Sequence, residues 1–209
     1  MYVSQPLHYF LDKLCSNSPE PGGGSASALT GAIAASLSGM LAALTVNKKG
    51  YENVKPEMEE FLSKAQSLKD DLLVLLQKDT EAFDDASKAF KLPKETEDEK
   101  KKRAEAIEAG LKKATEVPLA IMEKSLEVSR LSSEVLKKGN EMAISDGAIS
   151  ALFAEAACIG AMMNVRINFS WMKDKEYVKS IEQRVEDILD EVGRIKEDAL
   201  SYTLERLKS

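Results

Sequence analysis

Histidine and cysteine are almost absent from this sequence of 209 residues, which has one histidine, His8, and two cysteines, Cys15 and Cys158. A zinc site built from cysteine and histidine would lack ligands, and a Ser-His or Cys-His catalytic pair would have only His8 as its base. Each cysteine stands alone within an apolar stretch, so we expect core thiols. The scarcity excludes most familiar hydrolase chemistries and predicts no metal site.

An excess of positive charge is also missing. Lysine and arginine total 29 against 35 aspartates and glutamates, for a net charge of -6 and a pI near 5.1. Binding to a phosphate backbone is therefore not expected, and nucleic acid is excluded as a partner. The start, Met1–Phe10, lacks the basic residues and the long apolar run of a signal peptide, so we expect a cytoplasmic protein. The length suits one domain over residues 1–209.

Aromatic residues and prolines are few, at 6% and six residues, whereas 31% of residues are charged and helix formers dominate. No segment alternates as a strand does. The sequence predicts an all-α bundle of about seven helices with two largely buried central helices. We place the helices at residues 5–15, 25–47, 55–91, 97–116, 118–138, 145–170 and 175–207, with Pro118 at a first helical position and a Thr96/Glu99 capping box.

The two central helices are the expected 25–47 and 145–170. No charged residue occurs from Pro21 to Asn47, a stretch long enough to span a bilayer. Its many serine, threonine and glycine residues favour a buried helix instead, so no membrane partner is expected. Strong hydrophobes form one stripe on it: Leu29, Ile33, Leu37, Met40, Leu41 and Leu44.

Small residues recur every fourth position on another face of that helix. Gly31, Ala35 and Gly39 would allow a second helix to approach closely. The other predicted helices supply no obvious partner for this face. We therefore expect it to form a subunit interface in a homodimer.

An aspartate occupies an apolar position of the predicted helix 55–91. Apolar residues recur there at spacings of three and four: Met58, Phe61, Ala65, Leu68, Leu72, Leu75, Ala82 and Ala86. Asp79 falls in this series, and its neighbours one turn away are Leu75, Leu76, Ala82 and Phe83. Burial would raise its pKa, as a general acid working near neutrality requires. The alternative is a structural partner for a lysine or a backbone amide.

A glycine-rich turn, Pro21-Gly22-Gly23-Gly24-Ser25, leads into the helix 25–47. Backbone N–H groups and the positive end of the helix dipole meet there, which suits an anion. The Gly-Lys-Ser/Thr ending of a nucleotide-binding loop is missing. A plain glycine turn with Ser25 as the helix cap explains the same residues.

Two asparagines, Asn164 and Asn168, lie one turn apart on the apolar helix 145–170. Buried amides need hydrogen-bond partners, and a polar heterocycle would supply them. Asp146 precedes Asn164 by eighteen residues, about 27 Å along a helix, so one small pocket cannot touch both. A long ligand, a cross-subunit site or a dipole-favoured position in the first turn remain open for Asp146.

Short motifs with a common family origin run through the chain in one order: Pro21-Gly22-Gly23-Gly24-Ser25, Asp79-x-x-Ala82-Phe83, Lys91-Leu92-Pro93-Lys94, Val117-Pro118-Leu119, Gly139-Asn140, Ser145-Asp146, Gly160-Ala161 and Asn164-Val165-x-Ile167-Asn168. From about residue 5 to 205 the chain resembles the formimidoyltetrahydrofolate cyclodeaminase family. That family includes the C-terminal domain of formimidoyltransferase-cyclodeaminase and stand-alone bacterial cyclodeaminases or methenyltetrahydrofolate cyclohydrolases.

The resemblance implies an all-helical, dimeric subunit that binds a reduced folate, including polyglutamylated forms, and needs neither a metal nor an organic cofactor. The family's catalytic aspartate matches Asp79. Matched positions imply pterin or folate contacts at Asn140, Asp146, Asn164 and Asn168. The anionic glutamate tail has as candidate partners the turn Gly22, Gly23, Gly24 and Ser25 together with Lys48, Lys49, Lys94 or Arg103.

Three functions follow as alternatives. In the cyclodeaminase reaction, the second folate nitrogen attacks the formimino carbon, ammonia leaves and methenyltetrahydrofolate forms. A methenyltetrahydrofolate cyclohydrolase would instead interconvert methenyl- and formyl-tetrahydrofolate. The non-enzymatic alternative is a dimeric helical interaction protein in which Asp79 is a buried structural group.

Overall fold

The structure is a computed structural model that describes residues 2–208 and all of their side chains except those of residues 82–87. It confirms the all-α fold, because no strand occurs in the described range. The helices are η1 (Tyr2–Ser4), α1 (Leu7–Leu14), α2 (Gly23–Val46), η2 (Glu52–Val54), α3 (Lys55–Phe90), α4 (Glu97–Lys138), η3 (Glu141–Ala143), α5 (Ile144–Phe169) and α6 (Lys175–Arg206).

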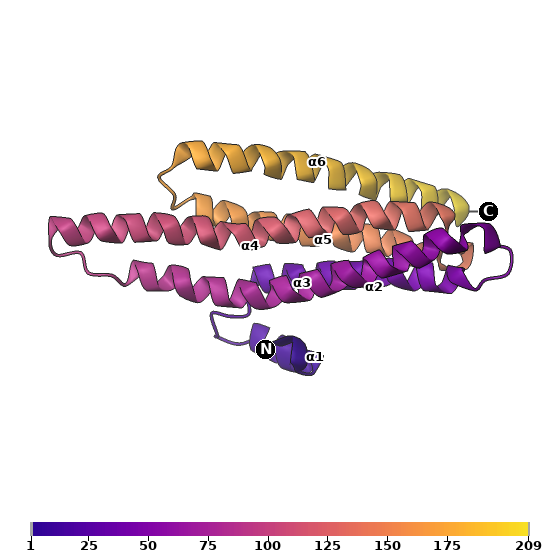
Figure 1. The fold of residues 1–209 in the computed structure, drawn as a ribbon, viewed down its shortest axis with the longest axis horizontal. Helices are drawn as coiled ribbons and strands as arrows, with labels where there is room; N and C mark the ends of the chain where they lie inside the picture. Colours follow the sequence, from indigo (N-terminus) through magenta and orange to yellow (C-terminus); the bar gives the residue numbers. More distant parts are fainter. Residues whose placement is uncertain (1, 209) are drawn as a thin grey trace.

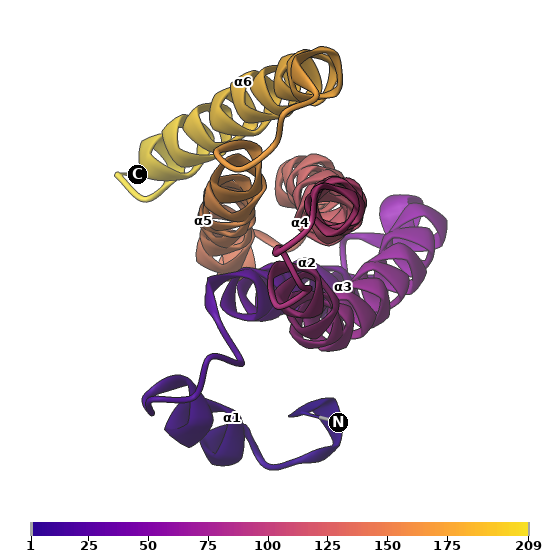
Figure 2. The same ribbon diagram turned by 90° about the vertical axis from the view of Figure 1, so that its left-hand side faces the viewer.

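Helices α2 to α6 form an elongated bundle, and α1 lies against its side near the N-terminus (Figure 1). Helix α2 contacts α3, α4 and α5, and α6 covers α4 and α5 (Figure 2). Helices α2 and α5 run in opposite directions, since Ser38 Oγ lies 2.8 Å from Ser150 Oγ while Gly160 lies beside Ser27. This arrangement brings the start of α2 next to the end of α5.

The small residues of α2 pack within the subunit. A Cβ on Gly31 would lie 3.2 Å from Leu72 and from Ser125 Oγ, and a Cβ on Gly39 would lie 3.2 Å from the Cβ of Ala65. The prediction that this face forms the subunit interface was therefore wrong. Helices α3 and α4 occupy it, because close helix packing needs small side chains.

The predicted hydrophobic stripe of α2 is only partly in the core. Leu41 is buried, whereas Ile33, Met40 and Leu44 are exposed. Because the small residues turn toward the neighbouring helices, the bulkier side chains of the other face remain outside. The stripe prediction was wrong for these three residues, and an apolar surface results.

Helix α4 is continuous across Pro118, where the sequence predicted a break. Proline has no N–H for the carbonyl four residues earlier, that of Ala114. The side chain of Asn168 donates to that carbonyl at 3.1 Å and replaces the missing bond. The capping box is confirmed, because Glu99 N donates to Thr96 Oγ1 at 3.2 Å and Thr96 N donates to the Glu99 carboxylate at 3.0 Å.

The two cysteines differ in environment. Cys158 is buried, and burial raises the pKa of its thiol to about 12. Cys15 is exposed at the end of α1, so the expectation of a core thiol was wrong there. Neither cysteine forms a disulfide.

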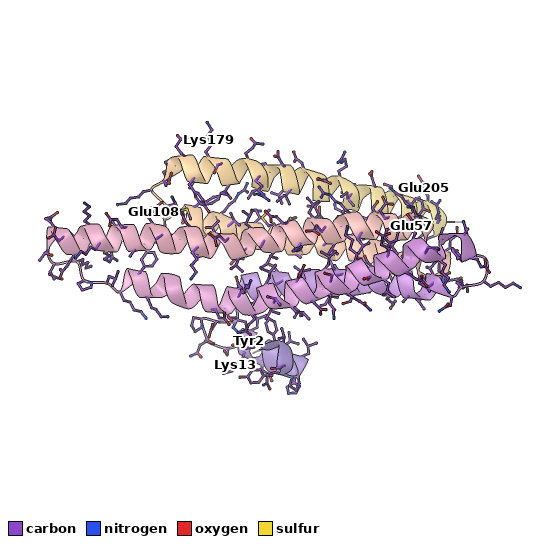
Figure 3. The ribbon with its side chains drawn as sticks, viewed as in Figure 1. Tyr2, Lys13, Glu57, Glu108, Lys179 and Glu205 are labelled. Atoms are coloured by element: carbon purple, nitrogen blue, oxygen red, sulfur yellow. The ribbon has the colours of Figure 1, made fainter. Side chains whose placement is uncertain are left out.

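Two segments, Gly23–Val46 and Glu141–Phe169, are long and apolar enough to cross a membrane by length and composition, and half of each is buried in the bundle. A core helix of a soluble protein passes the same test. Charged side chains project from the outer helices, with Glu57 and Glu205 near one end of the molecule and Glu108 and Lys179 toward the other (Figure 3).

Candidate active site

A cavity of about 690 Å³ lies where the start of α2 meets α3, α4 and the end of α5. Six of its lining residues are site residues expected from the sequence: Gly22, Gly23, Gly24, Asp79, Asn164 and Asn168. The other lining residues are Pro19, Glu20, Thr80, Phe90, Leu111, Ala114, Pro118, Ile167 and Trp171. A largely apolar wall with a few polar groups is typical of a site for a small organic molecule.

The carboxyl of Asp79 lies at the N-terminus of α2. Ser25 Oγ donates to Asp79 Oδ2 at 2.7 Å, and the backbone N–H of Ser25 also hydrogen-bonds to this carboxyl. Helix α2 begins at Gly23 with Gly22 as its N-cap, so Ser25 lies inside the first turn and is not the cap that the sequence suggested. The group that faces the positive end of the helix dipole is thus the chain's own carboxylate.

Gly24 makes this contact possible. A Cβ at this position would lie 2.2 Å from Asp79 Oδ1, a distance at which something must move. A Cβ on Gly23 would meet only Asn164 Nδ2, at an ordinary 3.6 Å. The glycine turn therefore allows the Asp79 carboxyl from α3 to lie against the start of α2. Gly24 is the position at which a side chain would clash with it.

Burial raises the pKa of the Asp79 carboxyl, while the hydrogen bonds from the Ser25 hydroxyl and backbone N–H act in the opposite direction. Burial is the larger effect. The carboxyl therefore holds a proton to a higher pH than an exposed aspartate does, which suits a group that both gives and takes protons near neutrality. No ion pair to Asp79 occurs among the described side chains, so its structural partner is Ser25 and not a lysine.

Of the helical neighbours expected around Asp79, Leu75 and Leu76 are buried. The side chains of Ala82 and Phe83 lie outside the described residues. The apolar register on α3 thus predicts correctly that Asp79 faces inward, and it lines the cavity.

The two asparagines differ in what they do locally. Asn164 Nδ2 donates to the carbonyl of Gly160 at 2.9 Å, within its own helix. Asn168 Nδ2 donates across to Ala114 on α4. No donor reaches either amide oxygen among the described residues, so both retain hydrogen-bonding capacity for a ligand.

Two aromatic residues at the cavity mouth were missed by the sequence analysis. Phe90 ends α3 and Trp171 follows α5, and their ring centroids lie 6.1 Å apart in an edge-to-face arrangement. Neither belongs to a polar motif, and nothing in the sequence places the two together. The single tryptophan of a chain poor in aromatics was the available signal.

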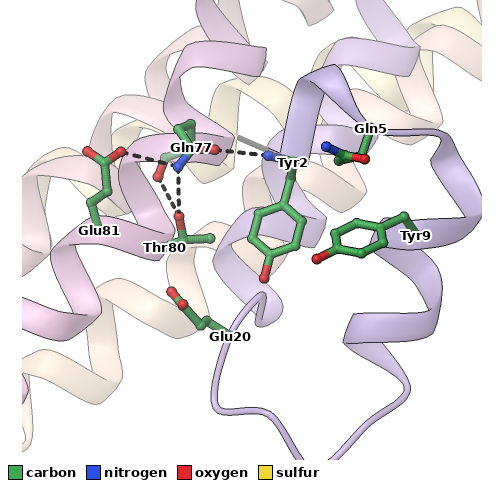
Figure 4. A pocket seen from close by; sticks show the side chains of 7 residues that line it. All are labelled: Tyr2, Gln5, Tyr9, Glu20, Gln77, Thr80 and Glu81. Atoms are coloured by element: carbon green, nitrogen blue, oxygen red, sulfur yellow. Dashed lines mark hydrogen bonds between the residues drawn. The ribbon is translucent and has the colours of Figure 1, made fainter.

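A second, smaller hollow of about 250 Å³ lies beside the cavity (Figure 4). It shares Glu20 and Thr80 with the cavity and is also lined by Tyr2, Gln5, Tyr9, Gln77 and Glu81. The N–H of Tyr2 donates to Gln77 Oε1 at 3.1 Å. This contact attaches the N-terminal segment to α3 next to the candidate site.

The other predicted site residues do not line the cavity. Asn140 is buried at the far end of α2, where its N–H donates to Thr45 Oγ1 at 2.9 Å, and Asp146 is in the first turn of α5 near it. Twenty residues of α2 separate Ser25 from Thr45, about 30 Å. Lys48 and Lys49 follow the same end of α2.

Lys94 and Arg103 do not line the cavity. Lys94 is exposed in the connection between α3 and α4. Arg103 donates to the carbonyl of Phe90 at 3.1 Å, and its Nε is buried without a hydrogen-bond partner in the described part of the chain. The Arg103 guanidinium thus contacts the backbone of Phe90.

No group of three or more histidine, cysteine, aspartate or glutamate side chains suited to a metal ion occurs among the described residues. The polar side chains that line the cavity are the carboxyls of Asp79 and Glu20, the Thr80 hydroxyl and the amides of Asn164 and Asn168, and the Ser25 hydroxyl bonds to Asp79. This set supports proton transfer and hydrogen bonding to a heterocycle.

Comparison with known proteins agrees with this site. The sequence model of the formiminotransferase-cyclodeaminase family matches residues 6–187. The chain belongs to this family. The match spans every element that lines the cavity, from the glycine turn to the end of α5, and confirms the resemblance derived from the motifs.

Individual relatives differ in length and in the activity for which they are named. The chain is 38% identical to the methenyltetrahydrofolate cyclohydrolase of Methylorubrum extorquens over 94% of this chain and 95% of that protein. It is 32% identical to the formimidoyltransferase-cyclodeaminase of Sus scrofa over 90% of this chain but only 35% of that protein. The crystal structure of formiminotetrahydrofolate cyclodeaminase from Thermotoga maritima is similar over 100% of both chains, with a TM-score of 0.88 and 27% identity.

Proposed function

We propose that this protein is a folate one-carbon enzyme that acts on the carbon between the two folate nitrogens N5 and N10, with Asp79 as its proton-transfer group. The observation that carries the proposal is the Asp79 carboxyl, which has a raised pKa and is held by Ser25 in a largely apolar cavity. Family membership supports a folate as the substrate. The chemistry uses neither a metal nor an organic cofactor.

The first candidate reaction is cyclodeamination of formimidoyltetrahydrofolate. N10 attacks the protonated formimino carbon, and the new C–N10 bond gives a tetrahedral carbon that carries an amino group. Asp79 takes the proton from N10 and gives it to the amino nitrogen, so that the C–N bond breaks and ammonia leaves. One carboxyl can serve both steps because burial raises its pKa, so that it holds a proton more readily than an exposed aspartate and can then give it up.

The second candidate is the cyclohydrolase reaction, in which water adds to the methenyl carbon. Asp79 would accept a proton from that water and return one to the nitrogen whose bond to the carbon breaks. The remaining hydroxyl proton is released to solvent as the C=O bond forms, which yields formyltetrahydrofolate. The match over nearly the full length of a protein named for this reaction favours it. The structural neighbour named as a cyclodeaminase favours the first.

Parallel assays separate the two reactions. The purified protein is given formimidoyltetrahydrofolate in one assay and methenyltetrahydrofolate in the other, and ammonia release is measured apart from opening of the methenyl ring. Ammonia release supports cyclodeamination, and ring opening alone supports the cyclohydrolase. A folded protein that binds neither folate at millimolar concentration would contradict both reactions and favour the helical interaction protein.

We propose further that the protein is a homodimer whose interface is the outer face of α2 and α5. Exposed apolar side chains cover this face: Ile33, Met40 and Leu44 from α2, and Phe153, Ile159, Met163 and Ile167 from α5. Exposed apolar patches of this kind mark association surfaces. Since Asp146 lies far from Asp79 in one subunit, an interface on α5 would offer it a folate bound in the partner subunit's site.

Sedimentation tests the dimer. Met40→Glu places a charge on the proposed interface, so we expect a dimer in the wild type and a monomer in this variant. Val74→Glu is the matched control, because Val74 is also exposed, at 53% against 43% for Met40, but lies on α3. A monomeric wild type at micromolar concentration would contradict the dimer, and an unchanged association state in Met40→Glu would contradict this interface.

A further inference from the structure

Packing in the core does not explain the position of the aromatic pair at the cavity mouth. Trp171 is 64% exposed and Phe90 38% exposed, yet both line the cavity. A tryptophan packed into the core would gain more from burial than one in this position. Two large rings that face a cavity and solvent together offer a surface on which a flat ring can bind.

The pair and Asp79 lie at opposite ends of the cavity. Phe90 follows Asp79 by eleven residues on α3, about 16 Å along the helix axis. Polar groups gather at the Asp79 end, where Ser25 and Asn164 lie close to the start of α2. Near the aromatic pair, the lining residues Leu111 and Ile167 are apolar, and the one amide there, Asn168, uses its N–H on Ala114. The cavity therefore has a hydrogen-bonding end and an aromatic end.

A reduced folate also has a hydrogen-bonding part and an aromatic part. Its pterin carries amino, oxo and ring N–H groups that need hydrogen-bond partners, whereas its p-aminobenzoyl ring is flat and apolar. The p-aminobenzoyl ring is bonded to N10, so it lies beside the reacting carbon on the side away from the pterin. Beyond it come the carboxylates of the glutamate.

We propose that Trp171 and Phe90 bind the p-aminobenzoyl ring of the substrate and so orient the folate in the cavity. The pterin then lies toward Asp79 and Asn164, and the glutamate leaves through the mouth. Arg103, which donates to the Phe90 carbonyl and has a buried Nε without a partner in the described part of the chain, supplies positive charge on the side where the carboxylates emerge. This inference rests on the proposed folate substrate.

The opposite orientation would leave the pterin against Leu111, Ile167 and the two aromatic rings. Its polar edge would lose several hydrogen bonds to water and gain only the Asn168 amide oxygen as a partner, which is unfavourable in an apolar site. The p-aminobenzoyl ring gains nothing from the polar end. Trp171 and Phe90 are therefore positioning residues, and they set specificity for substrates that carry the ring.

Calorimetry with a complete and a truncated probe tests the orientation. The complete probe is 5-formyltetrahydrofolate, and the truncated probe is 5-formyl-6-methyltetrahydropterin, which lacks the p-aminobenzoylglutamate. Trp171→Leu should lower the affinity for the complete probe by about tenfold and leave the affinity for the truncated probe unchanged. Trp171→Phe should retain most of the wild-type affinity for the complete probe. Tyr51→Leu, which removes an aromatic ring at the other end of the bundle, should affect neither probe.

Fluorescence gives an independent readout, because Trp171 is the only tryptophan of the chain. Saturation with the complete probe should change its emission, and saturation with the truncated probe should not. Equal losses for both probes in Trp171→Leu, or no loss for either, would overturn the orientation while leaving the folate substrate intact. A wild type that binds neither probe would overturn the proposed function itself.

Discussion

A Cβ atom on Gly24 would lie 2.2 Å from Oδ1 of Asp79, so the carboxyl occupies the space that a side chain at position 24 would need. Asp79 comes from α3 and Gly24 from the first turn of α2. Their contact holds the carboxyl against Ser25 and defines one end of the cavity. The glycine turn is thus part of how the proposed acid is positioned.

Gly24→Ala should displace Asp79 and lower turnover by at least tenfold, because a small displacement of a catalytic group lowers the reaction rate strongly. The measurement is kcat with either folate substrate, together with the circular dichroism of the folded variant. Gly23→Ala is the matched control, since its Cβ would make only an ordinary 3.6 Å contact with Asn164. Equal effects of the two substitutions would contradict a special role for Gly24.

Asp79→Asn keeps the size of the side chain but removes its titrating proton. We expect turnover to fall by roughly 10²–10⁴ while the affinity for 5-formyltetrahydrofolate changes much less. Steady-state kinetics and calorimetry on the same preparation measure the two effects. Near-normal turnover together with a lower melting temperature would show that Asp79 is a structural group.

The same variant predicts a pH dependence of stability. Because burial raises the folded-state pKa of Asp79 above its unfolded-state value, its contribution to stability is full below the unfolded-state pKa and is lost as pH rises through the folded-state pKa. Asparagine has no such loss. The melting temperature of Asp79→Asn relative to the wild type should therefore increase from about pH 4 upward and then level off.

Asp70→Asn, on the exposed side of the same helix, controls for the loss of one negative charge. Its melting temperature should show no comparable rise relative to the wild type. A constant difference between Asp79→Asn and the wild type across this pH range would contradict a raised folded-state pKa.

Local patterns predicted the elements well, because helix propensity and apolar spacing act within a few turns. The spacing on α3 was enough to turn Asp79 inward among Leu75 and Leu76. The face used for packing could not be predicted on α2, where small and bulky residues are both apolar. Burial there depends on how closely α3, α4 and α5 approach, and close approach selects the side of Gly31 and Gly39.

Contacts between distant segments were also beyond the sequence. Phe90 and Trp171 are apolar residues near helix ends, and only the three-dimensional arrangement joins them at one cavity mouth. A helix break was expected at Pro118 because proline has no N–H for the carbonyl four residues earlier. Helix α4 is continuous there because Asn168, on another helix, satisfies the Ala114 carbonyl.

This contact between Asn168 and Ala114 predicts a compensating pair of substitutions. Asn168→Leu leaves the Ala114 carbonyl without a donor and should destabilise the protein by about 1–3 kcal/mol. Pro118→Ala restores a backbone N–H at the fourth position after Ala114. In the Pro118→Ala background, Asn168→Leu should therefore cause a smaller loss of stability, measured by urea unfolding of all four proteins. Additive effects would contradict the compensation.

Ser25→Ala isolates the hydrogen bond that positions the Asp79 carboxyl. The Ser25 hydroxyl lowers the pKa of Asp79, so its removal should raise that pKa further and move the corresponding limb of the pH–rate profile to higher pH. Turnover should also fall by roughly tenfold, since hydrogen bonds to a charged group contribute about 1.5–3 kcal/mol. Ser27→Ala is the matched control: Ser27 is buried on the same helix turn but donates to the carbonyl of Gly23. A merely structural role for Ser25 would lower stability and leave the profile in place, whereas a displaced profile in Ser25→Ala alone would show that this hydroxyl acts through Asp79.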